Sequence, residues 1–367
     1  MRLILNVVLT VMIGGAVAGA IQSAPTKRPG EPTTCLKGLD PVALTQGQEL
    51  PGDSGISVVR GRYRYLFANA ENKATFEKQP DRYAIQLGGG CGRMGPLSGV
   101  GSPDRFLVHD GRIYIFASDQ CMNGFKSAPA KHIESDDPPL AGSDADLERG
   151  KELVQRALLG FGGAAKVDAI TSLEFKRVRI YQANGEDKEQ ATFTRIIFPD
   201  RFRLDDIWHS GSASDFVRGD AGFRIDIDGA WPMDEIVRRE FVKAIHRNPI
   251  ALLRARNQPG FRAAAAGRGK VGDQDVEWLV IHLNGANSTL GIDATSGRVL
   301  SIRYHGRAPS AIGEVTRTFS DFREVDGVKL PFAVATTYND SPTGDPRPFA
   351  AVTVNPKFES HLFATPE

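Results

Sequence analysis

Three cysteines are the residues of this chain best suited to chemistry. Cys35, Cys91 and Cys121 are the only cysteines among 367 residues, and all lie in the first third of the chain. Thiolates are soft ligands for zinc or copper, and three of them can form a trigonal site, or a tetrahedral one that His109 or water completes. Cys121 is expected near a helix start, where the helix dipole favours the thiolate. We predict a soft-metal site of Cys35, Cys91, Cys121 and His109, with zinc or copper as cofactor.

Other uses of these residues stay open. Exported cysteines usually pair as disulfides, and three of them leave one over. One disulfide would make this region a stapled structural or interaction module of the envelope. A thiol-dependent enzyme would instead need Cys91 or Cys121 as an activated thiolate beside a base. His109 precedes an Asp-Gly hairpin turn, where a polar residue needs no function.

Several classes of function lack their sequence signature. The 45 basic and 44 acidic residues nearly cancel, and no Lys/Arg stripe indicates a nucleic-acid partner. The sequence holds no Cys-x-x-Cys or His-Glu-x-x-His spacing, which excludes a c-type haem and leaves a zinc hydrolase unsupported. Residues 160–165 match a dinucleotide fingerprint in spacing, but they follow a helix, so they predict a glycine helix cap. We therefore expect a binding protein rather than an enzyme.

The elements that must position the cysteines form a near-repeat. Tyr65-Leu-Phe-Ala-Asn-Ala-Glu-Asn-Lys-Ala-Thr-Phe76 returns as Tyr114-Ile-Phe-Ala-Ser-Asp-Gln-Cys-Met-Asn-Gly-Phe125. Each copy predicts an alternating strand, a polar cap and an amphipathic helix that a proline stops. Between the copies lies a glycine-dense loop, 88–95, whose glycines permit positive φ or a close approach. Two such units would pack as a small pseudo-symmetric domain over residues 35–135.

This first domain resembles the YHS domain. The resemblance covers most of residues 35–135 and implies a small module linked to metal binding. Relatives carry a Phe-Cys-Ser-x-x-Cys knuckle, where this chain has Phe116-Ala-Ser-Asp-Gln-Cys121, so Ala117 replaces the first knuckle cysteine. The matching segments are Gly38-Leu-Asp-Pro-Val-Ala43, Tyr65-Leu-Phe67 with the helix from Asn69 to Phe76, Pro80 to Tyr83, and Gly89-Gly-Cys91.

The N-terminus predicts export. Arg2 precedes an uncharged apolar run from Leu3 to about Val17, and Ala18-Gly-Ala20 has the small-x-small pattern of a cleavage site. We expect a signal peptide over 1–20 and a flexible leader over 21–34. The mature protein would then be periplasmic or secreted, without a transmembrane span. Charged and proline-paired residues over 136–145 predict a linker between domains.

Residues 146–367 predict a large antiparallel sheet. Short alternating runs recur between turn residues, and a helical region interrupts them at 233–256. A further helix is expected over 144–159, with its apolar residues on one face. The fold class is therefore α+β: the small strand–helix module plus a curved antiparallel β half-barrel with lid helices on its concave side. The predicted strands are 173–181, 192–198, 201–204, 222–227, 276–283, 288–293, 299–304, 332–338 and 349–354.

The second domain is similar to the LolA-like fold of periplasmic lipoprotein carriers. The resemblance covers about 146–362, through the helix end Gly160–Ala164, the run Ile292–Val299 and the closing run Phe319–Pro331. It implies a half-barrel that holds a lipid or lipoprotein acyl chain, or another apolar ligand, under helices. We predict an exported, non-enzymatic protein that binds a soft metal in one domain and an apolar ligand in the other. Candidate lining residues are Trp208, Trp231, Trp278, Phe223, Phe241 and Leu252.

Overall fold

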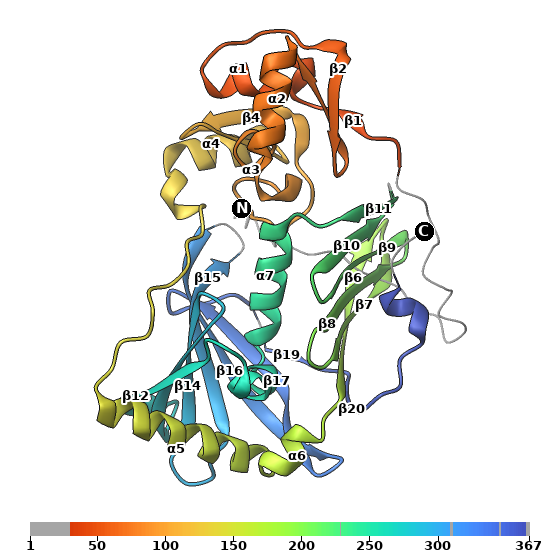
Figure 1. Ribbon diagram of the computed structural model, residues 1–367. Helices are drawn as coiled ribbons and strands as arrows, with labels where there is room; N and C mark the ends of the chain where they lie inside the picture. Colours follow the sequence, from red (N-terminus) through yellow and green to blue (C-terminus); the bar gives the residue numbers. More distant parts are fainter. Residues whose placement is uncertain (1–29, 228, 309–310, 345, 365–367) are drawn as a thin grey trace, which may run out of the picture.

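The chain folds into a small domain stacked on the end of a larger β-rich domain (Figure 1). The computed structural model describes residues 30–364, apart from 228, 309–310 and 345. The predicted signal peptide, 1–20, and most of the predicted leader, 21–34, lie outside the described residues. Among the residues described, none of the helices has the length and apolar character needed to span a membrane.

The near-repeat of the first domain folds as two strand–helix units. Asn69 and Ser118 cap the two helices alike, because each side-chain oxygen accepts the backbone N–H of its helix's third residue. The predicted order of strand, polar cap and helix is confirmed in both copies. The elements are β3 (Tyr63–Phe67) and α2 (Ala70–Lys78) in the first copy, and β5 (Arg112–Phe116) and α4 (Asp119–Ser127) in the second.

Aromatic rings from strand and helix close the core of each copy. The ring centroids of Phe67 and Phe76 are 5.2 Å apart in the first copy, and those of Phe116 and Phe125 are 5.4 Å apart in the second.

Thr33 and Thr34, predicted as the end of the leader, instead pair with β3 as the short strand β1 (Thr33–Thr34). The other elements are η1 (Leu36–Gly38), α1 (Pro41–Thr45), β2 (Asp53–Arg60), α3 (Pro80–Tyr83), η2 (Gln86–Gly89), β4 (Ser102–His109) and η3 (Pro129–Lys131).

The second domain is built on two antiparallel sheets. Their strand orders are β11-β10-β9-β8-β7-β6-β20 and β12-β13-β14-β15-β16-β17-β18, with β19 also paired to β17. The strands of the first sheet are β6 (Ser172–Ala183), β7 (Glu186–Ile197), β8 (Arg201–Trp208), β9 (Gly211–Arg218), β10 (Ala221–Asp226), β11 (Gly229–Pro232) and β20 (Ala351–Val354). The strands of the second are β12 (Arg262–Val271), β13 (Gln274–Leu283), β14 (Ala286–Asp293), β15 (Val299–Ala308), β16 (Ala311–Val325), β17 (Val328–Tyr338), β18 (Ser341–Pro342) and β19 (Arg347–Pro348).

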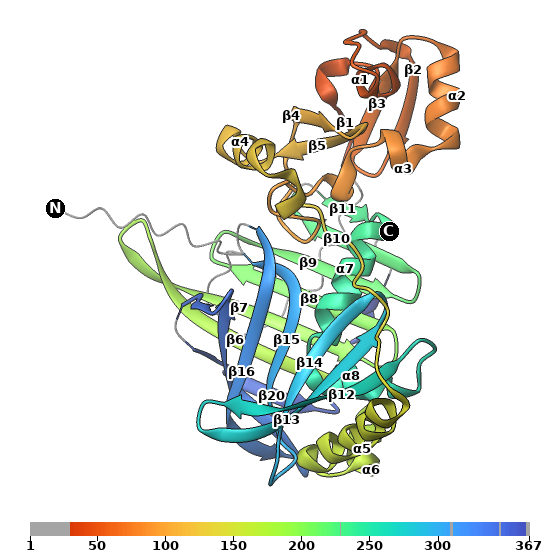
Figure 2. The ribbon, with the colours of Figure 1, turned by 90° about the vertical axis from the view of Figure 1, so that its left-hand side faces the viewer.

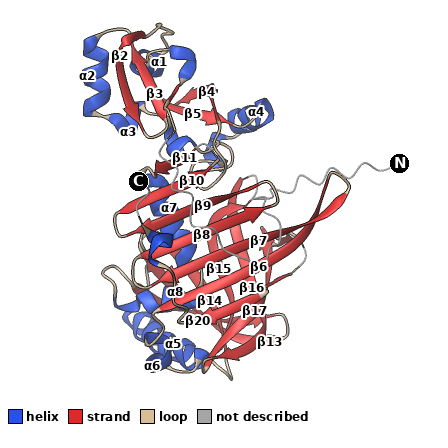
Figure 3. Ribbon diagram, turned by 90° about the vertical axis from the view of Figure 1, so that its right-hand side faces the viewer, coloured by secondary structure: helices blue, strands red, loops and turns tan. Residues whose placement is uncertain are grey.

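The C-terminal strands join the two sheets into one curved wall (Figure 3). Val334 of β17 pairs with Arg347 of β19, and a few residues later Val352 of β20 pairs with Phe175 of β6. No pairing in the described part of the chain joins β11 to β12, so the wall stays open. The predicted curved antiparallel half-barrel is confirmed.

Helices occupy the concave side and one end of this wall (Figures 1 and 2). Helix α7 (Glu235–His246) stands on the concave side, and α8 (Pro249–Arg254) follows it, so the predicted helical interruption is confirmed. Helices α5 (Asp144–Phe161) and α6 (Ala164–Asp168) cover one end. Short turns η4 (Ala255–Asn257) and η5 (Ser360–Phe363) complete the domain. Gly162 ends α5 at φ 117°, which confirms the predicted glycine cap.

One buried cluster unites the helices with the wall. Phe241 and Ile245 of α7 and Leu252 of α8 pack with Leu279 of β13 and Ile302 of β15. Because successive strand residues point to opposite faces, the face that carries these apolar residues is the inner face of the half-barrel.

Six strands of the second domain were not predicted from the sequence: β9, β11, β12, β16, β18 and β19. β9 contains Ser212-Ala-Ser-Asp215 and β12 contains Ala263-Ala-Ala-Ala-Gly267, and neither segment alternates apolar with polar residues. β16 runs through residues whose alternation is weak, and β8 extends to Trp208, beyond its predicted end at residue 204. Pairing with neighbouring strands decides these segments, because β-propensity is weaker than tertiary context.

Polar contacts hold the two domains together. Arg307 of β15 donates to the backbone oxygens of Arg93 (2.9 Å) and His132 (2.7 Å) and lies 3.2 Å from a carboxylate oxygen of Glu134. A second contact joins Arg62 to Asp226 at 2.6 Å. The loop 91–95, which carries Cys91, therefore rests directly on the half-barrel.

Candidate functional site

The structure separates the predicted cysteine ligands into two places. Cys35 is buried in the core of the first copy, against Leu36 and Tyr65, whereas Cys91 and Cys121 belong to the core of the second copy. All three are free thiols. Among the described residues, no group of three or more His, Cys, Asp and Glu side chains could hold a metal ion. Cys91 and Cys121 thus lie together, and Cys35 lies apart because it precedes the strand of the other repeat copy.

His109 does not join the cysteines in such a group. It ends β4, where its Nε2 lies 3.4 Å from a carboxylate oxygen of Asp110. Its ring meets the ring of Phe125 edge-on, with centroids 5.7 Å apart. Neither contact involves a cysteine. His109 therefore lies at the hairpin turn and packs against the aromatic core.

Cys91 occupies a pocket of backbone N–H donors. The N–H of Ala117 lies 3.4 Å from its sulfur. Burial raises the pKa of the Cys91 thiol and the nearby Cys121 thiol adds to the rise, while the N–H groups of Ala117, Arg93 and Met94 lower it. These donors favour negative charge on sulfur and oppose the cost of burial.

An aspartate stands at the corresponding place in the first copy. The carboxylate of Asp40 accepts the backbone N–H groups of Val42 (2.8 Å), Ala43 (3.1 Å) and Ala68 (2.8 Å). The side-chain amide of Asn72 donates to the same carboxylate at 2.8 Å. The first copy therefore holds a buried carboxyl group that accepts hydrogen bonds from four donors.

The two sites correspond residue by residue. Ala68 and Ala117 each follow the last phenylalanine of their strand, and Asn72 and Cys121 are each the third residue of their helix. The thiol pair Cys91–Cys121 therefore replaces the Asp40–Asn72 pair. The near-repeat already aligns Asn72 with Cys121, but the segments that hold Asp40 and Cys91 differ too much in sequence for that match to be found.

The predicted lining of the half-barrel needs correction. Phe241 and Leu252 lie in the inner core, as expected. Phe223 instead stacks on Phe216, outside that core, with ring centroids 5.4 Å apart. Trp278 also points away from the inner face, because its neighbour Leu279 points inward.

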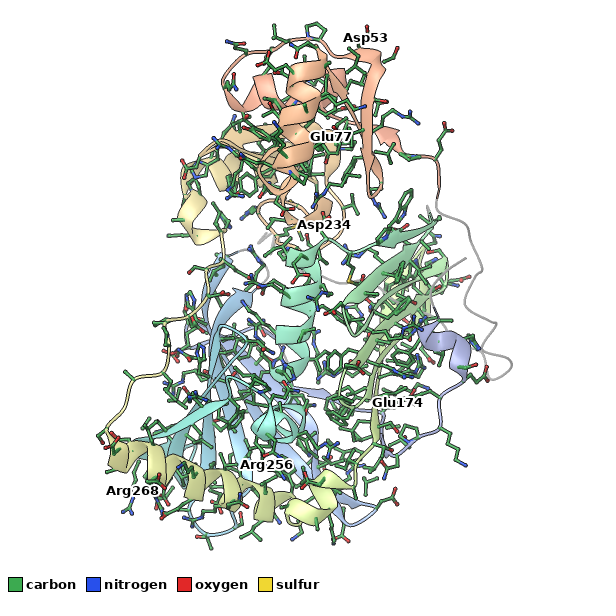
Figure 4. All side chains as sticks on the ribbon, viewed as in Figure 1. Asp53, Glu77, Glu174, Asp234, Arg256 and Arg268 are labelled. Atoms are coloured by element: carbon green, nitrogen blue, oxygen red, sulfur yellow. The ribbon has the colours of Figure 1, made fainter. Side chains whose placement is uncertain are left out.

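The other two tryptophans do not line the core either. Trp231 lies between the domains, 4.9 Å beneath the guanidinium of Arg62. It borders a small pocket of about 40 Å³ with Tyr63 and Asp234, and Figure 4 shows Asp234 at the top of α7. Trp208 ends β8 beside the turn to Gly211. Alternation along the strands and contact with the first domain explain these positions, which composition alone could not indicate.

A groove of about 730 Å³ lies between α5, η4 and β12. Leu147 and Val154 of α5 line it from one side, and Phe261 and Ala263 line it from the other. This volume falls within the range of about 300–1,000 Å³ that small-molecule sites occupy. No local pattern of residues indicates the groove, because its two walls are far apart in the chain.

Three of the five charged side chains that line this groove are ion-paired. Lys151 pairs with Glu148 at 2.6 Å, and Arg256 pairs with Asp168 at 2.5 Å. Figure 4 shows Arg256 close to α5. Arg262 also lines the groove and donates only to the backbone oxygen of Phe261, so the groove offers a ligand apolar walls together with one cation outside these ion pairs.

Comparison with known proteins gives only distant structural similarity. No family model and no curated protein matches the chain. A putative outer membrane lipoprotein-sorting protein domain from Vibrio parahaemolyticus is 13% identical, with a TM-score of 0.38. The match covers 59% of this chain and 97% of the Vibrio domain. A DUF1329 family protein from Desulfovibrio piger is 11% identical, with a TM-score of 0.40 and coverage of 60% and 97%. A LolA superfamily protein from Nitrosomonas europaea is 9% identical, with a TM-score of 0.39 and coverage of 59% and 97%.

TM-scores below 0.5 establish no common fold. The resemblance of the first domain to the YHS domain stays a prediction.

Proposed function

We propose that this chain is a non-enzymatic binding protein of the cell envelope whose second domain holds an apolar chain, such as the acyl chain of a lipid or lipoprotein. The observation that carries the proposal is the groove between α5, η4 and β12, with Leu147, Val154, Phe261 and Ala263 among its lining residues. An apolar chain gains free energy by leaving water for such apolar side chains. The envelope location rests on the predicted export signal.

A fluorescent fatty-acid analogue tests this proposal on the full chain. We expect saturable binding that an unlabelled fatty acid displaces. Leu147→Gln should weaken binding about tenfold, because it replaces an apolar wall residue with a polar amide. Leu159→Gln is the matched control, since Leu159 lies on the same helix but is 69% exposed and does not line the groove. Absence of saturable binding would exclude the groove as the ligand site, and so would an equal loss of affinity for the fatty-acid analogue in both variants.

A second function is favoured by the thiol pair of the first domain. We propose that Cys91 and Cys121 bind one soft cation, with copper(I) preferred to zinc. Two thiols suit a cation of low coordination number, whereas structural zinc almost always takes four ligands. The support is the replacement of Asp40 and Asn72 by two thiols at one donor-lined place.

Competition with a copper(I)-specific chelator under anaerobic conditions tests the thiol pair. We expect one copper(I) per chain, lost in Cys91→Ser and in Cys121→Ser but retained in Cys35→Ser, which serves as the matched control. Loss of binding in Cys35→Ser as well would restore the three-cysteine site predicted from the sequence. Failure of the unmodified chain to compete with the chelator would rule out the copper site.

A further inference from the structure

Four arginines gather on the inner wall of the half-barrel, well away from the groove. Arg177 and Arg179 of β6 are on the same strand face as Phe175, which belongs to the inner core. Arg317 of β16 is in register with Ile302 of β15, another inner core residue. Arg347 is the first residue of β19. We call Arg177, Arg179, Arg317 and Arg347 the arginine cluster.

The junction of the two sheets brings the cluster together. Arg347 pairs with Val334 of β17, and Arg317 is opposite Thr336 of the same strand. Three residues after Arg347, the N–H of Ala350 donates to the oxygen of Lys176 at 2.8 Å, which places β6 directly beside the junction. Arg177 is the residue after Lys176, and its guanidinium lies 4.3 Å from the ring centroid of Phe349.

In the described part of the chain, the arginines of the cluster form no ion pair, unlike Arg195, Arg203 and Arg224 of the same domain. Within residues 30–364 as described, neither Arg177, Arg317 nor Arg347 forms an ion pair with an acidic side chain. The Nε atoms of Arg177 and Arg179 are buried without a hydrogen-bond acceptor. Buried polar atoms normally have partners, so each missing one calls for an explanation.

Arginines on the outer face of the same sheet show the contrast. Arg195 is in register with Arg203 on the adjacent strand, and both bond to Asp205. Arg195 also lies 2.7 Å from Glu174. These two outer-face arginines are compensated by carboxylates, and so is Arg224 on the inner face of β10, which pairs with Asp215 at 2.7 Å. Arg177 has no such partner in the described part of the chain.

The electrostatics agree with an uncompensated cationic site. Burial, followed by the charges of Arg317 and Arg347, lowers the pKa of Arg177 to about 10. Two acids face the same side. Asp215 is already paired with Arg224, and Asp206 is linked to Arg177 across the strand register through Thr192. Burial raises the pKa of Asp206 to about 7, so near neutral pH it supplies only part of a negative charge.

We propose that the arginine cluster binds a phosphate group. Guanidinium forks match phosphate oxygens in a bidentate way, and like charges held together without counter-ions favour a multiply charged anion. The rings of Phe349 and Tyr304, the latter 5.4 Å from the Arg317 guanidinium, give the site apolar neighbours. The phosphate belongs either to a lipid headgroup or to a free phosphoryl compound. The site is distinct from the groove and does not depend on the function proposed for it.

Thermal unfolding of the full chain with three probes tests the site. The probes are inorganic phosphate, octyl phosphate below its micelle concentration and uncharged octyl glucoside, with sodium chloride at equal ionic strength as reference. An anion that binds only the folded state raises the unfolding temperature in a saturable way. Arg177→Gln and Arg317→Gln should each weaken phosphate binding about tenfold or more. Lys176→Gln is the matched control, since Lys176 neighbours Arg177 but points to the opposite face.

The ligand-free variants add a readout that separates a binding role from a structural one. Removing one of several repelling charges should raise the unfolding temperature of Arg177→Gln in chloride, while its response to phosphate is lost. Octyl phosphate binding at least tenfold tighter than inorganic phosphate would support a lipid headgroup, and equal binding would support a free phosphoryl compound. The proposal fails if no phosphate probe raises the unfolding temperature more than chloride does. It also fails if Lys176→Gln weakens phosphate binding as much as Arg177→Gln.

Discussion

Asp206 shows how one buried carboxyl can make this domain sensitive to pH. Burial is the largest cause of its raised pKa, about 7 against an ordinary 3.8, and the charges of Asp215 and Asp205 add to it. The Thr192 hydroxyl and Arg179 act in the opposite direction. Between these two pKa values the folded state keeps a proton that the unfolded state has released. The free energy of unfolding should therefore fall as the pH rises from about 4 to about 7.

Asp206→Asn should remove this dependence. The amide carries no charge, so we expect the variant to unfold at higher urea concentration than the unmodified chain above about pH 8, and at nearly the same concentration near pH 4. Urea denaturation at both pH values measures the effect. Asp273→Asn is the control, because Asp273 is exposed in the turn between β12 and β13. A pH profile that Asp206→Asn leaves unchanged would assign the dependence to other groups.

Asp40 carries a different residue-scale prediction. Its carboxylate serves four donors, including the first N–H groups of α1, and its side chain is fully buried. Asp40→Ala should lower the free energy of unfolding by about 3 kcal/mol, since a helix cap is lost and buried donors are left without acceptors. Chemical denaturation of the full chain measures this. Asp53→Ala, at an exposed strand position, is the control, and a loss below about 1 kcal/mol in Asp40→Ala would contradict the assignment.

At the scale of elements, the contact between α5 and β12 depends on a missing side chain. A Cβ at Gly150 would lie 2.5 Å from the backbone oxygen of Ala263, where only a backbone shift could make room. This close approach seats α5 against the strand edge and forms one side of the groove.

Gly150→Ala should therefore separate the helix from the strand despite the better helix propensity of alanine. We expect a loss of stability of roughly 1–3 kcal/mol from overpacking, together with weaker binding of the fatty-acid probe. Denaturation and the probe titration measure the two effects. Leu159→Ala, on the exposed side of the same helix, should leave both nearly unchanged. A stabilised Gly150→Ala variant would mean that helix propensity dominates and the contact is not tight.

At the scale of the whole molecule, Arg307 is the main tie between the domains. It reaches from β15 to two backbone oxygens and to Glu134 of the first domain's C-terminal segment. A Cβ at Gly95 would lie 2.1 Å from its Nε, so the loop that carries Cys91 closes tightly on this side chain. Each domain has its own core, so the contacts between them, which include Leu97 packed against the core of the second domain, determine whether the domains unfold together.

Arg307→Met should uncouple the two domains. The methionine keeps apolar bulk but loses every donor, and Glu134 then lacks its cation beside Glu240, whose pKa is already raised by burial and by Glu134. We expect two calorimetric transitions in place of one, and faster proteolysis in the linker 136–143. Arg303→Met, on the same strand, is the control. A single unshifted transition in Arg307→Met would show that other contacts suffice.

The sequence alone was enough to predict the elements and their order. Alternation, polar caps and stopping prolines act over a few residues, so they predicted both repeat units of the first domain. The same local signals predicted most strands of the half-barrel and the helices α7 and α8. They failed at β9 and β12, whose small and polar residues form strands only because neighbours pair with them.

Only the tertiary structure decided which side chains meet. Cys121 lies with Cys91 and not with Cys35, because the two repeat copies build separate cores. Arg177 meets Arg317 and Arg347 because β19 and β20 bridge strands that are distant in the chain. Such contacts depend on register and curvature across the whole sheet, which no local pattern encodes. Both candidate binding places of the second domain arise from these long-range contacts.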